Sequence, residues 1–247
     1  MARFLTLAAV ALHVLGGLLI APFMGRGETM PARGWRSALV SAWQRRLCHL
    51  LRLSVRVHGA PLEGPVLLAA NHVSWLDIIV LGGVCETRFL AKQEVRQWPL
   101  VGGLTARAGT LFIRRNAPGA AQHAADEMTW ALRRGCRLAL FPEGTTTDGS
   151  GLARFHSRLF QAAVRAHAPV QPVALRYAEN GGRSARAPFL GEQSLLNHLW
   201  HLSARGLEVE LHFLPPLQPL AGRAQLAAAS QSAIAAVLHA VPLAAAG

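Results

Sequence analysis

The sequence contains little cysteine and none of the motifs that carry several common chemistries. The three cysteines, Cys48, Cys85 and Cys136, form no CxxC pair and have no metal-ligand spacing. We therefore expect free, buried thiols in a reducing compartment and no metal site. No GxSxG nucleophile elbow occurs, which argues against a hydrolase that carries its own serine nucleophile. The sequence shows no internal repeat and no interdomain linker.

Acidic residues are also scarce. Lysine and arginine total 25 against 13 aspartates and glutamates, a formal charge of +12, and Lys92 is the only lysine. Such a surface attracts anionic lipid headgroups, an acidic carrier protein or nucleic acid, and charge alone does not choose among them. A genome rich in G and C explains the arginine bias equally well. A non-enzymatic lipid- or nucleic-acid-binding protein would explain the charge but not the motifs described below.

A long apolar run occupies the N-terminus. Residues 4–24 are almost wholly apolar, and about 20 such residues suffice to cross a bilayer, so residues 1–25 are predicted to form a membrane anchor. Arg26, Arg33 and Arg36 follow, which by the positive-inside tendency places the body of the protein in the cytoplasm. A signal peptide is the alternative, because Arg3 provides a minimal basic region, but the run is long and the arginines after it oppose export. A re-entrant or interfacial helix also fits.

Residues 35–53 have the periodicity of an amphipathic helix. Arg45 and Arg52 are expected on its polar face. Such a helix either packs on the domain or lies in the plane of a membrane. The residues expected on the apolar face are Leu39, Val40, Trp43, Leu47, Leu50 and Leu51.

Residues 54–220 alternate short apolar runs with helical stretches. This pattern predicts one α/β domain, a mixed, largely parallel sheet flanked by helices. Residues 181–188 read as a loop rich in glycine and arginine, and residues 221–247 as a closing helix (221–241) and tail. The expected strands are 66–70, 88–91, 110–113, 137–141, 170–177 and 207–213. The expected helices are 75–82, 99–107, 118–134, with Asn116 as its cap, and 157–166.

The run NHVSWLD at residues 71–77 follows a strand that is expected to be buried. On one continuous helix, a five-residue gap would separate the side chains of His72 and Asp77 by about 140°. With His72 in the turn before the helix, however, Asp77 can fold back and accept a hydrogen bond from one ring nitrogen. That bond leaves the other nitrogen as a base, and a substrate that brings its own hydroxyl needs no serine. Considered alone, a structural histidine that caps the helix explains the pair as well.

The run FPEGTTTDG at residues 141–149 ends a second apolar stretch. The carboxylate of Glu143, the amide of Gly144 and the hydroxyls of Thr145 and Thr146 can hold a polar headgroup beside a histidine. The alternative is an ordinary strand-to-helix loop, with a turn at residues 148–149.

The two runs belong to four ordered blocks that resemble the glycerolipid acyltransferase family, typified by 1-acylglycerol-3-phosphate acyltransferase. That family carries NHxSxxD, GxxFIxR and FPEGTRS-like blocks and then an apolar strand with proline. The resemblance covers roughly residues 57–215 and implies a glycerol-3-phosphate acyltransferase-like fold. Lys92 and Glu94, with Pro99 and Gly102, resemble the stretch between the first two blocks. The matching residues are Asn71, His72, Ser74 and Asp77; Gly109, Phe112, Ile113 and Arg115; Phe141, Pro142, Glu143, Gly144 and Thr145; and Val170, Pro172 and Val173.

The resemblance implies a reaction and a location. His72 acts as the general base on an acceptor hydroxyl, Asp77 orients it, and the hydroxyl attacks an acyl thioester without a covalent acyl-enzyme or a metal. The donor is acyl-carrier protein or acyl-CoA, no further cofactor is expected, and the remaining partners are membrane lipids rather than nucleic acid. The protein is expected at the bacterial inner membrane, facing the cytoplasm. A hydrolase in which His72 and Asp77 activate water is a remote alternative. The expected substrate-binding residues are Asn71, Ser74, Lys92, Arg115, Glu143, Gly144, Thr145 and Thr146.

Two departures from the family pattern concern the acceptor. Thr146 stands where the phosphate-using members have arginine, and residues 155–163 lack the glycine of an FKxG-like stretch. Both features resemble the bacterial subgroup that acylates lyso-ornithine lipid, whose headgroup carries a carboxylate and an amine. Arg115 could bind either a carboxylate or a phosphate. Alternatively, Arg154 or Arg158 replaces the missing arginine and the acceptor is lysophosphatidic acid. His198 and His201 are interpreted as a helix-surface pair.

Overall fold

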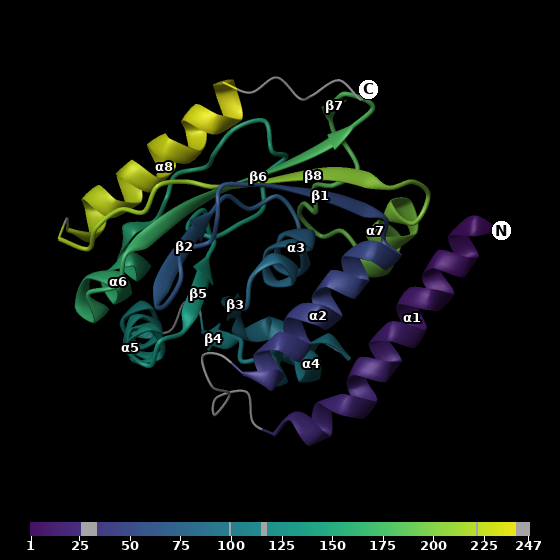
Figure 1. Cartoon of the computed structure of the whole chain (residues 1–247), viewed down its shortest axis with the longest axis horizontal. Helices are drawn as coiled ribbons and strands as arrows, with labels where there is room; N and C mark the ends of the chain where they lie inside the picture. Colours follow the sequence, from purple (N-terminus) through teal and green to yellow (C-terminus); the bar gives the residue numbers. More distant parts are fainter. Residues whose placement is uncertain (26–33, 99, 115–117, 221, 241–247) are drawn as a thin grey trace.

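The fold is a mixed sheet with helices on both faces (Figure 1), seen in a computed structural model that describes residues 1–25, 34–98, 100–114, 118–220 and 222–240. The strand order is β1-β8-β6-β2-β5-β3-β4, and β7 pairs with β6. Only the β6–β8 and β6–β7 pairings among these are antiparallel, so the predicted fold class is confirmed. The strands are β1 Leu53–His58, β2 Val66–Ala70, β3 Arg88–Lys92, β4 Leu111–Ile113, β5 Arg137–Leu140, β6 Val170–Glu179, β7 Gly182–Arg183 and β8 Leu207–Phe213. The helices are α1 Ala2–Ile20, α2 Trp35–Leu50, α3 Leu76–Val84, α4 Val101–Arg107, α5 Ala120–Arg133, α6 Gln161–Ala166, α7 Leu195–Leu202 and α8 Arg223–Ala240, with 3₁₀-helices at Ala21–Met24, Gln93–Gln97 and Ser157–Phe160.

Strand β2 lies at the centre of the sheet, parallel to both β5 and β6. All of its residues are fully buried, which is why its sequence is a continuous apolar run rather than an alternating one. Val66 and Leu68 pack into the core beneath α2 and α3. Leu67 and Ala69 pack into the core formed with α5, α6 and α8 on the opposite face. The carboxyl end of β2 is therefore held rigidly from both sides.

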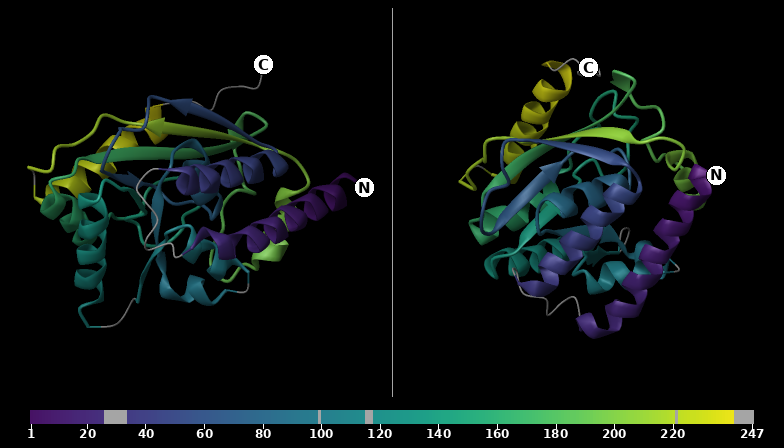
Figure 2. Two further views of the ribbon diagram at one scale, coloured as in Figure 1. Left: turned by 60° about the horizontal axis from the view of Figure 1, so that its bottom comes forward. Right: turned by 45° about the vertical axis from the view of Figure 1, so that its right-hand side comes forward.

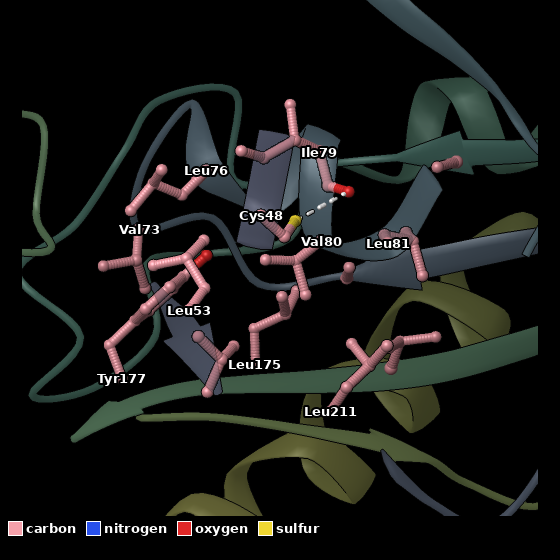
Figure 3. Close-up of a cluster of buried hydrophobic side chains, with 14 of the residues drawn as sticks. Cys48, Leu53, Val73, Leu76, Ile79, Val80, Leu81, Leu175, Tyr177 and Leu211 are labelled. Atoms are coloured by element: carbon pink, nitrogen blue, oxygen red, sulfur yellow. Dashed lines mark hydrogen bonds between the residues drawn. The ribbon is translucent and has the colours of Figure 1, made fainter. Parts of the chain in front are cut away.

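The packing of α2 on α3 differs from the predicted arrangement. Leu39, predicted on the buried face, is 39% exposed, whereas Ser37, Ser41 and Gln44 are buried. A Cβ atom on Gly82 of α3 would lie 2.1 Å from Oε1 of Gln44, so this glycine allows the two helices to approach closely. The buried side of α2 therefore includes these small and uncharged polar side chains as well as Leu47 and, at the C-cap, Leu51, which were predicted to be buried. Nearer the C-terminal end of α2, Cys48 packs in the buried cluster shown in Figure 3.

The apolar helix α1 lies against the domain, beside α2, α4 and α7 (Figures 1 and 2). Residues 3–24 form a helical stretch of 22 residues with a mean hydropathy of 2.3, long and apolar enough to cross a membrane. His13 stacks on Trp43 of α2 with ring centroids 4.8 Å apart. Arg26 and Arg33, predicted to follow the anchor, lie outside the described residues.

Several predicted elements need correction. Strand β1 was not predicted. Helix α2, predicted to reach residue 53, ends at Leu50, because Arg52 takes a left-handed backbone conformation (φ 55°) that a helix cannot continue through. The short strand β7 was also not predicted, whereas His198 and His201 do lie on a helix, α7. The predicted helix 157–166 is a 3₁₀-helix followed by α6. The N-cap of α5 is Gly119, and Asn116, the predicted cap, lies outside the described residues.

Candidate active site

The two sequence motifs lie together at one edge of the sheet. Strands β2 and β5 are parallel neighbours, so the loops that follow them leave the sheet side by side. The backbone N–H of His72 donates to Oε1 of Glu143 at 2.7 Å, and the N–H of Thr147 donates to the carbonyl of His72 at 2.8 Å. The imidazole of His72 stacks on Phe141, with centroids 4.1 Å apart. Hydrogen bonds on both peptide groups of His72 therefore join the loops.

Asp77 folds back onto His72, as expected. Its Oδ2 lies 2.7 Å from Nδ1 of His72 and accepts the backbone N–H groups of Val73 and Ser74 at 2.8 and 3.0 Å. Because Oδ2 is an acceptor, Nδ1 carries the proton and Nε2 has a free lone pair. The His72 side chain is 19% exposed and that of Asp77 is fully buried. Within the described ranges, Nε2 of His72 has no hydrogen-bond partner, so it is open to a substrate.

Tyr177 on β6 completes the surroundings of Asp77, and the sequence motifs did not predict it. Its hydroxyl donates to Oδ1 of Asp77 at 2.6 Å. Burial, and then the nearby Asp77 carboxylate, raise the pKa of Tyr177 well above its ordinary value, so the phenol remains a donor. Figure 3 shows the Tyr177 side chain in the same buried cluster as Val73. The one available clue was that the only tyrosine of the chain lies in a strand expected to be apolar.

Asn71 and Ser74 are buried beneath the loop. The amide of Asn71 donates to the carbonyl of Leu175 at 3.0 Å and accepts the Leu175 N–H at 2.7 Å. It thereby continues the pairing of β2 with β6 beyond the end of the strand. Ser74 is fully buried, and no described residue forms a hydrogen bond with its Oγ. Both side chains were predicted to bind substrate, and in this structure both are buried.

Glu143 connects three segments of the site. It is 3% exposed, and its Oε1 and Oε2 accept the backbone N–H groups of His72 and Ala153, each at 2.7 Å. Burial raises the pKa of Glu143 above its ordinary value, although the two backbone donors act in the opposite direction. Each of its carboxylate oxygens thus holds one backbone segment of the site in place.

Of the other predicted binding residues, Lys92, Gly144, Thr145 and Thr146 lie in segments that leave the carboxyl ends of β3 and β5. Gly144 has a φ of 72°, the left-handed conformation that glycine adopts without strain. Thr145 and Lys92 are exposed, and Lys92 ends β3, whose carboxyl end points to the same edge as that of β5. The hydroxyl of Thr146 donates to the carbonyl of Phe189 at 2.5 Å. Arg115 lies outside the described residues.

His198 does not lie on a helix surface, so its predicted pairing with His201 there is wrong. It is 6% exposed, its Nδ1 accepts the indole N–H of Trp75 at 2.9 Å, and its Nε2 lies 2.9 Å from the carbonyl of Arg186. Burial lowers the pKa of His198. His201 is exposed. Among the residues that the structure describes, no group of three or more His, Cys, Asp or Glu side chains could hold a metal ion.

A largely parallel sheet that presents a His–Asp pair and a glycine–threonine loop beyond neighbouring strands is the framework of an α/β enzyme. Residues 54–176 match the Acyltransferase family. The lyso-ornithine lipid O-acyltransferase of Pseudomonas aeruginosa is 42% identical over 237 residues, covering 94% of this chain and 90% of the relative. The chain therefore belongs to the acyltransferase family, in its lysophospholipid and lysophosphatidic acid branch, and is an O-acyltransferase.

Two further relatives extend the comparison. The 1-acyl-sn-glycerol-3-phosphate acyltransferase of Neisseria gonorrhoeae is 39% identical over 150 residues, covering 60% of this chain and 59% of the relative. The crystal structure of the 1-acyl-sn-glycerophosphate acyltransferase of Thermotoga maritima superposes with a TM-score of 0.67 at 21% identity, covering 97% of both chains. The structural similarity supports the fold.

Proposed function

We propose that this enzyme transfers an acyl chain from a thioester to the hydroxyl of lyso-ornithine lipid, with His72 as general base. The observation that carries the proposal is the hydrogen bond between Nδ1 of His72 and Asp77, because it leaves Nε2 free and accessible. Nε2 removes the hydroxyl proton while the oxygen attacks the thioester carbonyl carbon. The C–S bond then breaks, and the departing sulfur takes the proton back from His72. Asp77 stabilises the imidazolium that forms between these steps.

The acceptor headgroup binds beside Lys92, Gly144 and Thr145, of which Lys92 and Thr145 are exposed. Thr146 supplies no guanidinium for a phosphate, which favours a headgroup with a carboxylate and an amine. The relative that matches nearly the whole chain also carries the lyso-ornithine lipid name. Lysophosphatidic acid is the alternative acceptor, supported by the Neisseria relative and by the exposed side chains of Arg154 and Arg158.

The donor is acyl-carrier protein or acyl-CoA. Both are acidic, and the chain carries a formal charge of +12, which favours encounter with either donor. No metal enters the mechanism, because the hydroxyl, the base and the leaving thiolate account for every proton and electron pair.

The protein binds the bacterial inner membrane from the cytoplasmic side, and α1 lies along the membrane surface. Two contacts of α1 with the domain support the in-plane orientation of this helix. The rings of Phe4 and Trp200 pack edge to face with centroids 5.4 Å apart, and Arg107 donates to the carbonyl of Ala21 at 2.7 Å. Both ends of the helical stretch are thus held by the domain. Its outer face leaves Leu12 and Phe23 72% and 85% exposed, an apolar surface suited to the headgroup–acyl boundary.

A two-acceptor, two-donor assay on membranes containing the full chain tests the proposal. We expect transfer to be fastest with lyso-ornithine lipid and to fall by about 10²-fold or more in His72→Ala. His123→Ala is the matched control, because His123 is exposed on α5 and should retain full activity. Exclusive use of lysophosphatidic acid would overturn the acceptor, and near-normal transfer by His72→Ala would overturn the base. Release of free fatty acid without an acceptor would instead indicate a hydrolase.

A further inference from the structure

One residue outside the four motif blocks bridges the two catalytic loops. The backbone N–H of Phe189 donates to the carbonyl of Val73 at 3.0 Å, and its carbonyl accepts the Thr146 hydroxyl at 2.5 Å. Val73 directly follows His72, and Thr146 belongs to the loop after β5. We call residues 187–190 the strap. Its central peptide groups thus connect the two loops beside the candidate base.

The strap is anchored firmly at its start. Ala187 is fully buried, and its N–H donates to Oγ of Ser184 at 3.2 Å. The preceding Arg186 forms an ion pair with Glu179 at 2.7 Å and also donates to backbone carbonyls near the end of α7. A bidentate arginine–carboxylate pair of this kind fixes orientation as well as position. The strap is therefore a fixed support rather than a loose loop.

His198 holds the strap from its other side. Its ring centroid lies 5.2 Å from that of Phe189. An indole N–H can only donate, so Nδ1 of His198 accepts from Trp75, and Nε2 carries the proton and donates to the carbonyl of Arg186. Trp75 lies in the NHVSWLD run, two residues before Asp77. The strap and His198 thus contact Val73 and Trp75, which follow His72 in the same turn.

We propose that Thr146 is a positioning residue, which acts on His72 through Phe189 and does not donate to the acceptor headgroup. A threonine hydroxyl has one proton, and here the carbonyl of Phe189 accepts it. A carboxylate or phosphate can only accept hydrogen bonds, so Thr146 has nothing left to donate to it. This inference rests on the proposed role of His72 and concerns how that role is supported.

Removing the hydroxyl should therefore affect turnover rather than acceptor choice. Without its donor, the Phe189 carbonyl loses the hydrogen bond that joins the strap to the loop after β5, and Phe189 and Val73 are held less firmly. Catalysis is sensitive to such shifts, since a displacement of about 1 Å can cost about 10²-fold in rate. A partial loss of support predicts a smaller effect, roughly 10-fold.

The test compares Thr146→Val, which keeps the shape without the donor, with Thr146→Ser, which keeps the donor. Steady-state kinetics of the full chain in membranes are measured with lyso-ornithine lipid and with lysophosphatidic acid. We expect Thr146→Val to lower kcat about 10-fold for each acceptor that wild type uses, with KM changed less than about twofold, and Thr146→Ser to restore kcat. Unchanged kinetics in Thr146→Val would overturn the inference. So would a change in the acceptor ratio or a rise in KM alone, because either would indicate direct headgroup binding.

Trp75→Phe gives an independent measurement if Thr146→Val accumulates poorly. It replaces the indole with a smaller phenyl ring and so removes the N–H that His198 accepts together with part of the ring that packs against the core; kcat should fall several-fold for both acceptors with KM unchanged. Wild-type turnover in this variant would contradict the support from His198. His72→Ala, measured in parallel, distinguishes a failure of the role proposed for Thr146 from a failure of the proposed function. If His72→Ala is inactive while Thr146→Val is normal, the strap inference alone fails; if His72→Ala is active, the proposed function fails.

Discussion

The hydroxyl of Tyr177 donates a 2.6 Å hydrogen bond to Oδ1 of Asp77, and these residues are 100 positions apart in the sequence. On the opposite oxygen, Asp77 accepts from the ring of His72 and from two backbone N–H groups. Both carboxylate oxygens of Asp77 are thereby held by hydrogen-bond donors. Tyr177 of strand β6 thus holds Asp77 in place, and Glu143 holds the backbone of His72.

Tyr177→Phe should slow acyl transfer while preserving the fold. The change removes one donor and leaves Oδ1 of Asp77 buried without its partner, which costs about 1–3 kcal/mol of stability for such a group. Asp77 can then rotate and hold His72 less firmly, so we expect kcat to fall about 10-fold, a 1.4 kcal/mol effect on the barrier. Kinetics and thermal unfolding of membrane-bound enzyme measure both effects. Wild-type kcat would show that Tyr177 serves stability alone.

The ionisation of Tyr177 can be followed directly, because it is the only tyrosine of the chain. Burial and Asp77 raise its pKa well above the ordinary value of 10.0. The folded protein therefore keeps the neutral phenol, and this contribution to stability is present below pH 10 and is lost as the pH rises toward the folded pKa. Tyrosinate absorbance should appear only together with alkaline unfolding. Its appearance near pH 10 in folded protein would contradict the burial of Tyr177.

The sequence predicted those parts of the fold and site that depend on local patterns. Strand β2 has its predicted bounds because its apolar run is continuous, and the contact between Asp77 and His72 was predictable because one turn of chain separates them. Tyr177 and Phe189 were missed because they reach the site through strand pairing and a distant loop, which leave no local periodicity. On α2 and its C-cap, the burial of Leu47 and Leu51 was predicted correctly, but the burial of Ser37, Ser41 and Gln44 was not, because Gly82 on another helix allows the close approach that buries Gln44.

Gly102 and Gly103 are adjacent in α4 and should respond oppositely to alanine. A Cβ on Gly102 would lie 2.1 Å from the backbone carbonyl of Arg96, whereas a Cβ on Gly103 would meet nothing within 4 Å. Because backbone cannot move aside cheaply, Gly102→Ala should destabilise the fold by about 1–3 kcal/mol. Gly103→Ala should be neutral or stabilise by up to about 1 kcal/mol through helix propensity. Thermal unfolding of both variants measures the difference, and equal effects would contradict the close packing.

The buried His198 should make the fold sensitive to mild acid. Burial lowers the pKa of His198 below its ordinary value of 6.5, so below pH 6.5 the unfolded chain binds a proton that the folded state does not. Its contribution to stability is therefore present above pH 6.5 and is lost as the pH falls toward the folded pKa. Protonation also removes the acceptor for the Trp75 indole.

His198→Asn should flatten this part of the pH dependence, because asparagine does not titrate and its amide oxygen can still accept the Trp75 N–H. The exposed His123 provides the matched control, and His123→Asn should keep the wild-type profile. Both are measured as the unfolding midpoint against pH from neutral to mildly acidic conditions. His212 sets the background in both variants, because burial lowers its pKa too. The informative quantity is therefore the difference between the two profiles, and identical profiles would show that His198 is not the group whose protonation weakens the fold.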